Sequence, residues 1–217
     1  MCIRDSIIDS PITSRVPFNG SDGLVTEDLD RDGFIDIVSV HESDATYDSA
    51  EHDPDFEESS LGHVRISFGS FDPKIWTSVT LAEGEIVSSP EDAAIQDLNG
   101  DGFLDILVAA ENGHVVFFQN PGKDIRTRTW PSRIIPMTQG RGSFLRVFAA
   151  DFNGDGKPEI VSPNTGAQRP GPYDFSQSNP VSIFSISGSP LQSESWSETI
   201  LGKYSIPQNS EPVDLDG

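Results

Sequence analysis

An acidic motif recurs along this chain, and it restricts the possible fold more than any other feature. The segments DLDRDGFID, DLNGDGFLD and DFNGDGKPE begin at Asp28, Asp97 and Asp151, and a shortened copy, DLDG, begins at Asp214. Successive copies are 69, 54 and 63 residues apart. Periods of this length are typical of proteins in which each repeat is one supersecondary unit. We therefore interpret the chain as a series of repeats. Their acidic loops span residues 28–36, 97–105, 151–159 and, in truncated form, 214–217.

A tryptophan occurs at a similar place in each repeat. Trp76, Trp130 and Trp196 lie 21, 21 and 18 residues before the next acidic motif. This second marker keeps step with the loops, which supports a common architecture for the repeats. We expect the three tryptophans to pack between neighbouring repeats, and a surface platform for a ligand is the alternative.

Each repeat also shows a pattern of four short strands. In the second repeat, DAAIQ precedes the acidic loop, DILVAA follows it, HVVFFQN runs back and WPSRII supplies the fourth strand. Asn112-Gly113 between the middle two strands is typical of a hairpin turn with positive φ. The third and fourth strands are expected in VRISF and WTSVTL of the first repeat and in VSIFSIS and WSETIL of the third. No stretch of ten or more residues has the apolar period of a helix.

Repeated four-stranded units, each with a tryptophan, predict an all-β protein built from β-propeller blades of four antiparallel strands. Composition agrees, because 19 Gly and 16 Pro suit turns better than helices. A β-solenoid is the alternative, but its coils are normally much shorter than these repeats. We expect residues 7–217 to contain about three blades of a larger propeller.

The acidic loops follow the pattern D-x-[DN]-x-D-G-x-x-[DE], which suits a hard cation. Side-chain oxygens at positions 1, 3, 5 and 9 and the backbone carbonyl at position 7 can supply six or more oxygen ligands, while the Gly at position 6 permits a sharp turn. Without metal, the carboxylates of one loop repel each other. We therefore predict one structural Ca²⁺ per complete loop, with solvated acidic turns as the alternative.

The predicted ligands occupy the same motif positions in all three complete loops. They are Asp28, Asp30, Asp32, Asp36 and the Phe34 carbonyl in the first; Asp97, Asn99, Asp101, Asp105 and the Phe103 carbonyl in the second; and Asp151, Asn153, Asp155, Glu159 and the Lys157 carbonyl in the third. We expect the third set to differ most in geometry, because its Glu is one methylene longer and follows a proline.

An EF-hand begins with a similar motif but closes with a bidentate Glu at position 12 and has helices on both sides. Position 12 is Ser39, Val108 or Ser162 here, within sequence typical of strands. The EF-hand interpretation is therefore excluded.

Charge and cysteine content exclude several classes of partner and site. The formal net charge is −21, from 35 acidic and 14 basic residues, so nucleic acids and anionic membrane surfaces are repelled. We expect no nucleic-acid partner and no direct membrane insertion by this part of the protein. Cys2 is the single cysteine, which excludes an internal disulfide and a multi-cysteine metal site. Cations, neutral glycans and proteins remain as partners.

The segments DLDRDGFIDIV, DLNGDGFLDIL and DFNGDGKPEIV resemble the FG-GAP and VCBS-type repeats of bacterial surface proteins, which are related to the calcium-binding propeller blades of integrin α chains. The resemblance covers essentially the whole chain after residue 6. It implies a β-propeller, commonly of seven blades, with calcium in the hairpin loops. The Gly-Ala-Pro that gives FG-GAP its name is missing after Asp105 and Glu159. This departure favours the VCBS-like class and weakens any transfer of integrin ligand binding.

The two ends of the sequence resemble cuts through a longer repeat array. MCIRDS, residues 1–6, can be encoded by a string like the transposon-end adapter of sequencing libraries, and we interpret it as an artefact to be excluded from fold reasoning. A genuine N-terminus is the alternative. The tryptophan position of the first repeat would fall at residue 7, and the last acidic loop stops at Gly217. We therefore expect further blades of the same chain beside these.

The long connection at residues 41–63 contains three of the four histidines, His41, His52 and His63, together with many carboxylates. A second metal site is conceivable there, but the histidine spacings match no compact ligand motif. We expect an acidic, solvated connection, and its length makes it a candidate partner-binding loop.

No catalytic constellation is apparent in the sequence. Glu91 and Asp92 are adjacent in a predicted strand, so their side chains point to opposite faces and make a poor glycosidase pair. We expect a noncatalytic, calcium-binding propeller module of a secreted or surface bacterial protein, extracellular or periplasmic, that serves adhesion or recognition of a protein or glycan. The alternative is a part of a calcium-dependent propeller polysaccharide lyase, or an accessory module of a secreted hydrolase.

Overall fold

The computed structural model describes residues 22–42, 62–126, 129–166 and 176–209, together with Val213 and Leu215. Three sequence-based predictions lie outside these residues. They are the adapter interpretation of residues 1–6, most of the truncated loop 214–217 and the proposed contribution of His52.

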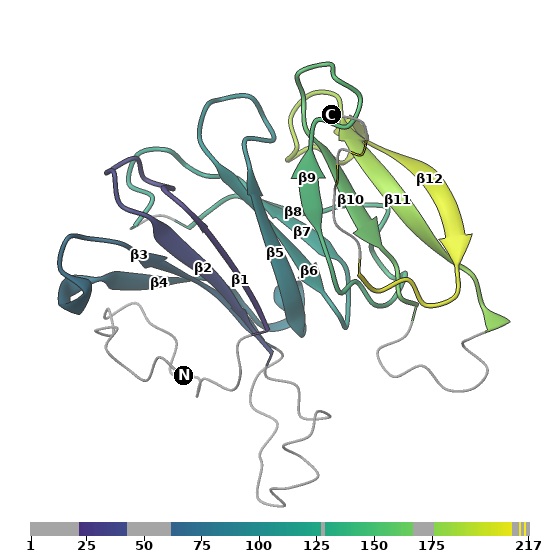
Figure 1. Ribbon diagram of the computed structural model, residues 1–217, viewed down its shortest axis with the longest axis horizontal. Coiled ribbons are helices and arrows are strands. Elements are labelled where there is room, and N and C mark those ends of the chain that lie inside the picture. Colours follow the sequence, from purple (N-terminus) through teal and green to yellow (C-terminus); the bar gives the residue numbers. More distant parts are fainter. Residues whose placement is uncertain are drawn as a thin grey trace, which may run out of the picture.

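The described residues form strands and the loops that connect them (Figure 1). The strands are β1 (Gly23–Glu27), β2 (Asp36–His41), β3 (His63–Phe68), β4 (Thr77–Glu83), β5 (Pro90–Gln96), β6 (Asp105–Ala110), β7 (Val115–Phe118), β8 (Ser132–Ile134), β9 (Phe148–Ala150), β10 (Glu159–Pro163), β11 (Asn179–Ile186) and β12 (Trp196–Tyr204). Short 3-10 turns are η1 (Pro73–Ile75), η2 (Gly84–Val87) and η4 (Ser193–Ser195). Within the described residues no helix is long and apolar enough to cross a membrane.

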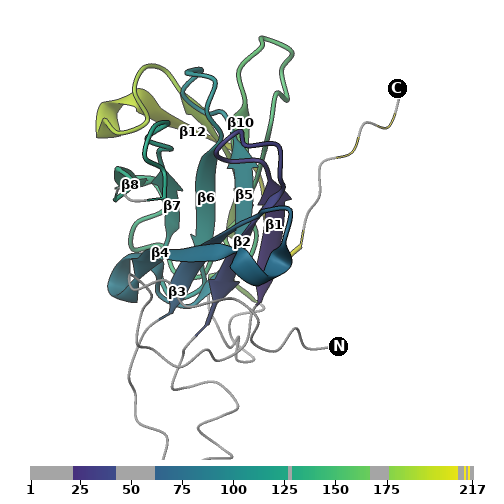
Figure 2. The same cartoon turned by 90° about the vertical axis from the view of Figure 1, so that its left-hand side faces the viewer.

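The strands make three antiparallel sheets of four, which we call blade 1 (β1–β4), blade 2 (β5–β8) and blade 3 (β9–β12). In each blade the strands pair in sequence order. The sheets stand face to face in a row (Figure 1), and the side view shows blade 1 in front of blade 2 (Figure 2). The all-β prediction and the four-stranded repeat are confirmed, and the arrangement is that of propeller blades.

The predicted strands of the second repeat correspond to β5, β6, β7 and β8, and the predicted outer strands of the other repeats correspond to β3, β4, β11 and β12. The turn between β6 and β7 differs from the prediction. The Gly113 N–H donates to the Ala110 carbonyl at 3.2 Å, and neither Asn112 nor Gly113 has positive φ. The prediction of positive φ was wrong, because this connection turns on Glu111 and Asn112 with Gly113 as an additional residue.

The hydrophobic cores lie between blades. In β6, Ile106 and Val108 belong to the core shared with blade 1, whereas Leu107 and Ala109 belong to the core shared with blade 3. Successive side chains of a strand point to opposite faces, so a strand covered on both faces is apolar throughout. The uninterrupted apolar run ILVAA therefore follows from the central place of blade 2.

Two of the three tryptophans pack between blades, as expected from the sequence. Trp130 is buried in the core between blades 1 and 2, and Trp196 is buried between blades 2 and 3, where its ring meets that of Phe117 edge-on at 6.3 Å. Trp76 is half-buried. Each indole N–H donates to a backbone carbonyl five or six residues earlier in the chain. The tryptophan thereby fixes the connection before the fourth strand of its blade, and for Trp130 and Trp196 that connection lies beside the preceding blade.

The first strands of the blades, β1, β5 and β9, lie side by side along the row. Each is followed by an acidic loop and then by the second strand of its blade. Because the three blades have the same strand order, the three loops emerge at corresponding ends of the sheets. This topology places loop 1 (residues 28–36), loop 2 (97–105) and loop 3 (151–159) in equivalent positions.

Candidate metal centres

The three acidic loops share one hydrogen-bond scheme, although their sequences differ. The N–H of the Gly at position 6 donates to the carboxylate at position 1 in every loop, at 2.9, 2.8 and 2.8 Å. The N–H at position 5 donates to the side-chain oxygen at position 3, and the N–H at position 7 donates to the carboxylate at position 5. The side chains at positions 1, 3 and 5 are therefore folded back onto the loop that carries them.

The carboxylate at position 9 has a structural role of its own. Asp36 accepts the Leu29 N–H at 2.9 Å with one oxygen and the Gly69 N–H at 2.8 Å with the other. Leu29 lies within loop 1 and Gly69 directly follows β3, so one side chain joins three segments of blade 1. Asp36 is fully buried. In loop 2, Asp105 makes the same two contacts, with the N–H groups of Leu98 and Asn120.

Loop 3 departs from this scheme at position 9. The Glu159 carboxylate accepts the Phe152 N–H at 3.1 Å and the Asn153 side-chain N–H at 2.8 Å. Both partners lie in loop 3. The longer Glu side chain therefore closes the loop on itself, whereas the Asp of the other two loops reaches the segment just after the third strand.

Burial changes the protonation of the position-9 aspartates. Burial raises the pKa of Asp36 to about 6, with a smaller contribution from the charges of Asp30 and Asp32, although the Gly69 and Leu29 N–H groups lower it. Burial likewise raises the pKa of Asp105 to about 7. These carboxyls lie among further carboxylates of their loops, so a bound cation would favour their ionised form.

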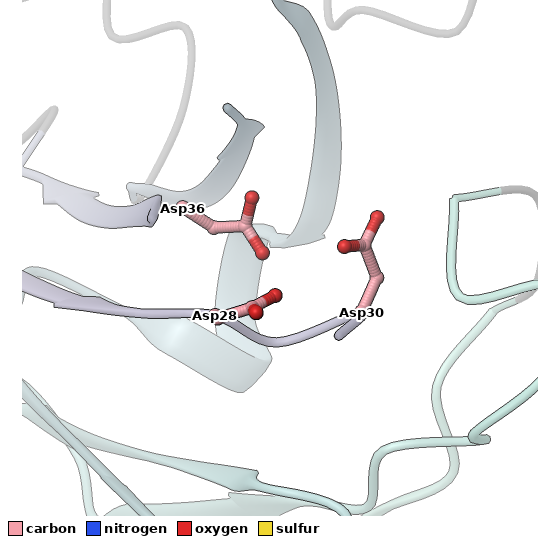
Figure 3. A group of neighbouring side chains, drawn as sticks. All are labelled: Asp28, Asp30 and Asp36. Carbon is pink, nitrogen blue, oxygen red and sulfur yellow. The ribbon is translucent and has the colours of Figure 1, made fainter. Parts of the chain in front are cut away.

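Loop 1 brings three of its predicted ligands together. Asp28, Asp30 and Asp36 each offer a carboxylate oxygen, and the three oxygens lie within 4.8 Å of one another. Figure 3 shows the three carboxylates directed into a common space from the loop and from the start of β2. Asp32 is not part of this group, and its oxygens accept from the Phe34 N–H and from a guanidinium of blade 2.

Loops 2 and 3 carry an asparagine at position 3, and its side-chain N–H is directed at a carboxylate. Asn99 donates to Asp101 at 2.9 Å, and Asn153 donates to Glu159. Both asparagines also accept the N–H of position 5 with their oxygen. The predicted ligand side chains of each loop therefore remain neighbours, but an amide replaces the second carboxylate of loop 1.

Part of the chain that includes loops 2 and 3 matches the model of a known family of repeats. A family model described as FG-GAP-like repeat matches residues 97–162. The chain contains an FG-GAP-like repeat. No curated protein matches the sequence. The FG-GAP-like repeat begins at the first residue of loop 2 and ends within β10, so it includes loops 2 and 3 and most of blade 2. Loop 1 lies outside the matched residues but has the same hydrogen-bond scheme.

Two features around the FG-GAP-like repeat were missed in the sequence because their residues are distant along the chain. The first is Arg126, which lies between β7 and β8 and pairs with Asp30 and Asp32 of loop 1 at 2.6 and 2.9 Å. Loop 1 and Arg126 are more than 90 residues apart. The spacing of residues within the acidic motif cannot reveal this contact, because the contact depends on how blades 1 and 2 pack.

The second missed feature is a group of glutamates from two blades. Glu42 follows β2, Glu91 lies in β5 and Glu111 follows β6, and their carboxylates offer oxygens within 4.8 Å of one another. Burial raises the pKa of Glu91 to about 7, and the charges of Glu111 and Asp22 raise it further. Glu91 thus belongs to a group of carboxylates that spans the interface between blades 1 and 2. From the sequence, Glu91 was considered only as a pair with Asp92, and that pair could not indicate this group.

The histidines of the long connection are only partly placed. His41 and His63 are register partners in β2 and β3, and their rings stack with centroids 4.5 Å apart. Burial lowers the pKa of His63 to about 4, and the charges of His41 and Arg65 lower it further. Most of the connection, residues 43–61, lies outside the described residues, so the predicted acidic, solvated connection and its alternative, a second metal site, both stay untested.

Proposed function

We propose that this chain is a noncatalytic, calcium-stabilised propeller module of a secreted or surface bacterial protein that recognises a protein or glycan. The observation that carries the proposal is the common arrangement of the three loops. In each, side-chain oxygens at positions 1, 3 and 5 are held by backbone N–H groups, and a buried carboxylate closes the loop at position 9. Three sequences with one arrangement support one shared ligand.

The chemistry of the donors fits calcium. The side chains offered by the loops are carboxylates and amides, so the donors are oxygens, which hard cations prefer. In loop 1 three carboxylates converge, and one of them, Asp36, is fully buried. Burying several carboxylates without a counter-charge is unfavourable. A divalent cation would remove this cost, and its binding would release the proton that Asp36 and Asp105 hold at mildly acidic pH.

Asp36 and Asp105 would transmit binding in loops 1 and 2 to the blade. Each joins its acidic loop to the segment just after the third strand, at Gly69 and Asn120 respectively. Calcium supplies the positive charge that neutralises the loop when bound. The loop carboxylates would then hold the first two strands of the blade together, and the position-9 aspartate would hold the third. The proposed role of the metal is therefore structural.

Calcium titration calorimetry on the full chain tests the proposal. We expect one site per complete loop and the loss of one site in Asp97→Asn, which weakens the position-1 ligand of loop 2. Asp72→Asn is the matched control, because Asp72 is exposed and lies outside the loops. Its binding should equal that of the wild type. No binding, or binding unchanged by Asp97→Asn, would contradict the proposal.

Location and partner are proposed from the repeat class. FG-GAP-like repeats typically occur in extracellular or surface proteins, and calcium sites in extracellular modules can be weak because external calcium is abundant. Arrays of neutral glycans and of surface proteins, probed with and without chelator, test for a calcium-dependent partner. Turnover of an acidic polysaccharide by the isolated chain would instead support the lyase alternative.

A further inference from the structure

The Arg126 side chain places a positive charge against the carboxylates of loop 1. Its Nε donates to an Asp30 carboxylate oxygen at 2.7 Å, and its Nη2 lies 2.6 Å from the same oxygen and 2.9 Å from an Asp32 oxygen. The guanidinium stacks over the Phe68 ring at 4.7 Å from the centroid. Contacts with two carboxylates and an aromatic face fix the position of this side chain.

The contact crosses the interface between blades 1 and 2. Arg126 follows Ile125, which is buried in the core between the two blades together with Leu29 of loop 1. Asn120 of blade 2 also donates its side-chain N–H to the Leu29 carbonyl at 3.2 Å. The backbone that carries Arg126 is therefore held against loop 1 independently of charge.

We propose that Arg126 competes with calcium for Asp30 and Asp32, so that loop 1 binds calcium more weakly than loop 2, and this inference rests on the proposed calcium function. A calcium ion in loop 1 would lie close to a guanidinium that contacts two of the predicted ligands. Repulsion between the two cations, and the loss of the guanidinium contacts if Arg126 moves away, both lower the affinity. Calcium in loop 1 would then loosen a contact between blades 1 and 2.

Loop 2 has no ion pair like that of Arg126 in the described part of the chain. The cation beside loop 2 is Arg31 of loop 1, whose guanidinium stacks on the Phe103 ring at 4.5 Å from the centroid and forms no ion pair with a loop 2 carboxylate. Arg126 lies four residues before Trp130, and the residue four before Trp196 is Gln192, which carries no charge. The connections are comparable, because Leu98 of loop 2 shares a core with Leu191 and Trp196. Among the described residues, no lysine or arginine forms an ion pair with a carboxylate of loop 2 or loop 3.

Calcium titration of Arg126→Met tests the inference. Met keeps an unbranched apolar side chain beside the Phe68 ring but removes the charge. To observe loop 1 alone, the titration is repeated in a background of Asp97→Asn and Asp151→Asn, which weaken loops 2 and 3. We expect Arg126→Met to bind calcium at loop 1 roughly tenfold more tightly, as one screened cation near the site would predict.

Two further variants serve as controls. Arg133→Met removes the same charge from blade 2 at a side chain that donates to the Leu191 carbonyl instead of a loop, so calcium affinity should change less than twofold. Arg126→Lys keeps the charge and should retain the weak affinity. If Arg126→Met fails to fold, Arg126→Gln replaces it, because a polar side chain suits this half-exposed position. We expect the same tightening for Arg126→Gln.

The outcomes separate this inference from the proposed function. If loops 2 and 3 bind calcium and Arg126→Met and Arg126→Gln leave the affinity of loop 1 within twofold of wild type, the competition is refuted while the calcium function stands. A tightening of equal size in Arg133→Met would also overturn it, because net charge alone would then explain the effect. If no loop binds calcium in any variant, the proposed function fails and the inference fails with it.

Discussion

Loop 1 and loop 3 share one scheme of backbone hydrogen bonds, but loop 1 packs against a neighbouring blade and loop 3 is exposed to solvent. In loop 1 the Asp30 side chain is 10% exposed and touches a guanidinium from blade 2. In loop 3 Asp151, Asn153 and Asp155 are all exposed, and the Gly156 N–H, together with other loop N–H groups, lowers the pKa of Asp151. The comparison teaches that the motif determines the backbone of the loop, while the neighbouring blade determines its charge and solvent exposure.

Removing the position-9 carboxylate should give the largest difference between these loops. Asp36→Ala leaves the buried N–H groups of Leu29 and Gly69 without their acceptor, and we expect a loss of about 2–4 kcal/mol in the free energy of unfolding. Glu159→Ala affects only partners within loop 3, so its loss should be about 1–2 kcal/mol. Urea unfolding in chelator measures both.

Asp36→Asn is the conservative control for this comparison, because it keeps an oxygen acceptor for one of the two N–H groups. Its stability should lie between those of wild type and Asp36→Ala. Equal losses for Asp36→Ala and Glu159→Ala would show that the contact with the third strand contributes nothing, and the difference drawn here between the two loops would be wrong.

The pH dependence of stability should also differ between the loops. In the metal-free protein the pKa of Asp36 is about 6, above its ordinary value of 3.8. Asp36 therefore contributes stability that is fully present below pH 3.8 and is lost as the pH rises through 6. As the pH rises from 4 to 7, the free energy of unfolding of wild type should therefore fall by on the order of 1–2 kcal/mol relative to that of Asp36→Asn.

Asp151→Asn is the matching change in loop 3, and there the sign is reversed. The pKa of Asp151 is lowered, so its contribution is present above pH 3.8 and is lost as the pH falls below its ordinary value. The difference between this variant and wild type should be constant above about pH 5. Chemical unfolding from pH 4 to 7 in chelator measures both variants, and parallel curves for the two would refute the assignment of Asp36.

The ion pair of loop 1 should have the smallest effect on the metal-free protein. Arg126 relieves repulsion among the loop 1 carboxylates, but it is partly exposed, so Arg126→Met should lower the free energy of unfolding by about 0.5–1 kcal/mol at low salt. Salt screens such contacts, and the loss should shrink in about 0.5 M NaCl. A loss that is independent of salt would mean that packing on Phe68, and not charge, is the contribution of Arg126.

Much of the fold could be predicted from the sequence because the relevant signals are local. The acidic motifs and tryptophans locate the blades, and the run ILVAA in β6 is apolar because both of its faces are covered. The turn at Asn112-Gly113 was predicted with the wrong conformation, because the same dipeptide also fits a longer connection that needs no positive φ.

The parts that could not be predicted are contacts between blades. Arg126 reaches Asp30 across 96 residues of sequence, and the glutamate group at Glu91 also combines residues of two blades. No sequence spacing encodes these contacts, because they depend on the angle and the distance at which two sheets pack. The sharp turn of each acidic loop could be predicted for the opposite reason, since nine consecutive residues determine it, and calcium ligation by these residues stays a prediction.

Thermal unfolding of the full chain in calcium and in chelator tests the central claim most directly. A ligand that binds only the folded state raises the midpoint as its concentration increases. We predict that the midpoint rises with calcium, rises less with magnesium at the same concentration, and returns to the metal-free value when chelator is added. A midpoint that is the same in saturating calcium and in chelator would contradict a structural role for calcium in these loops.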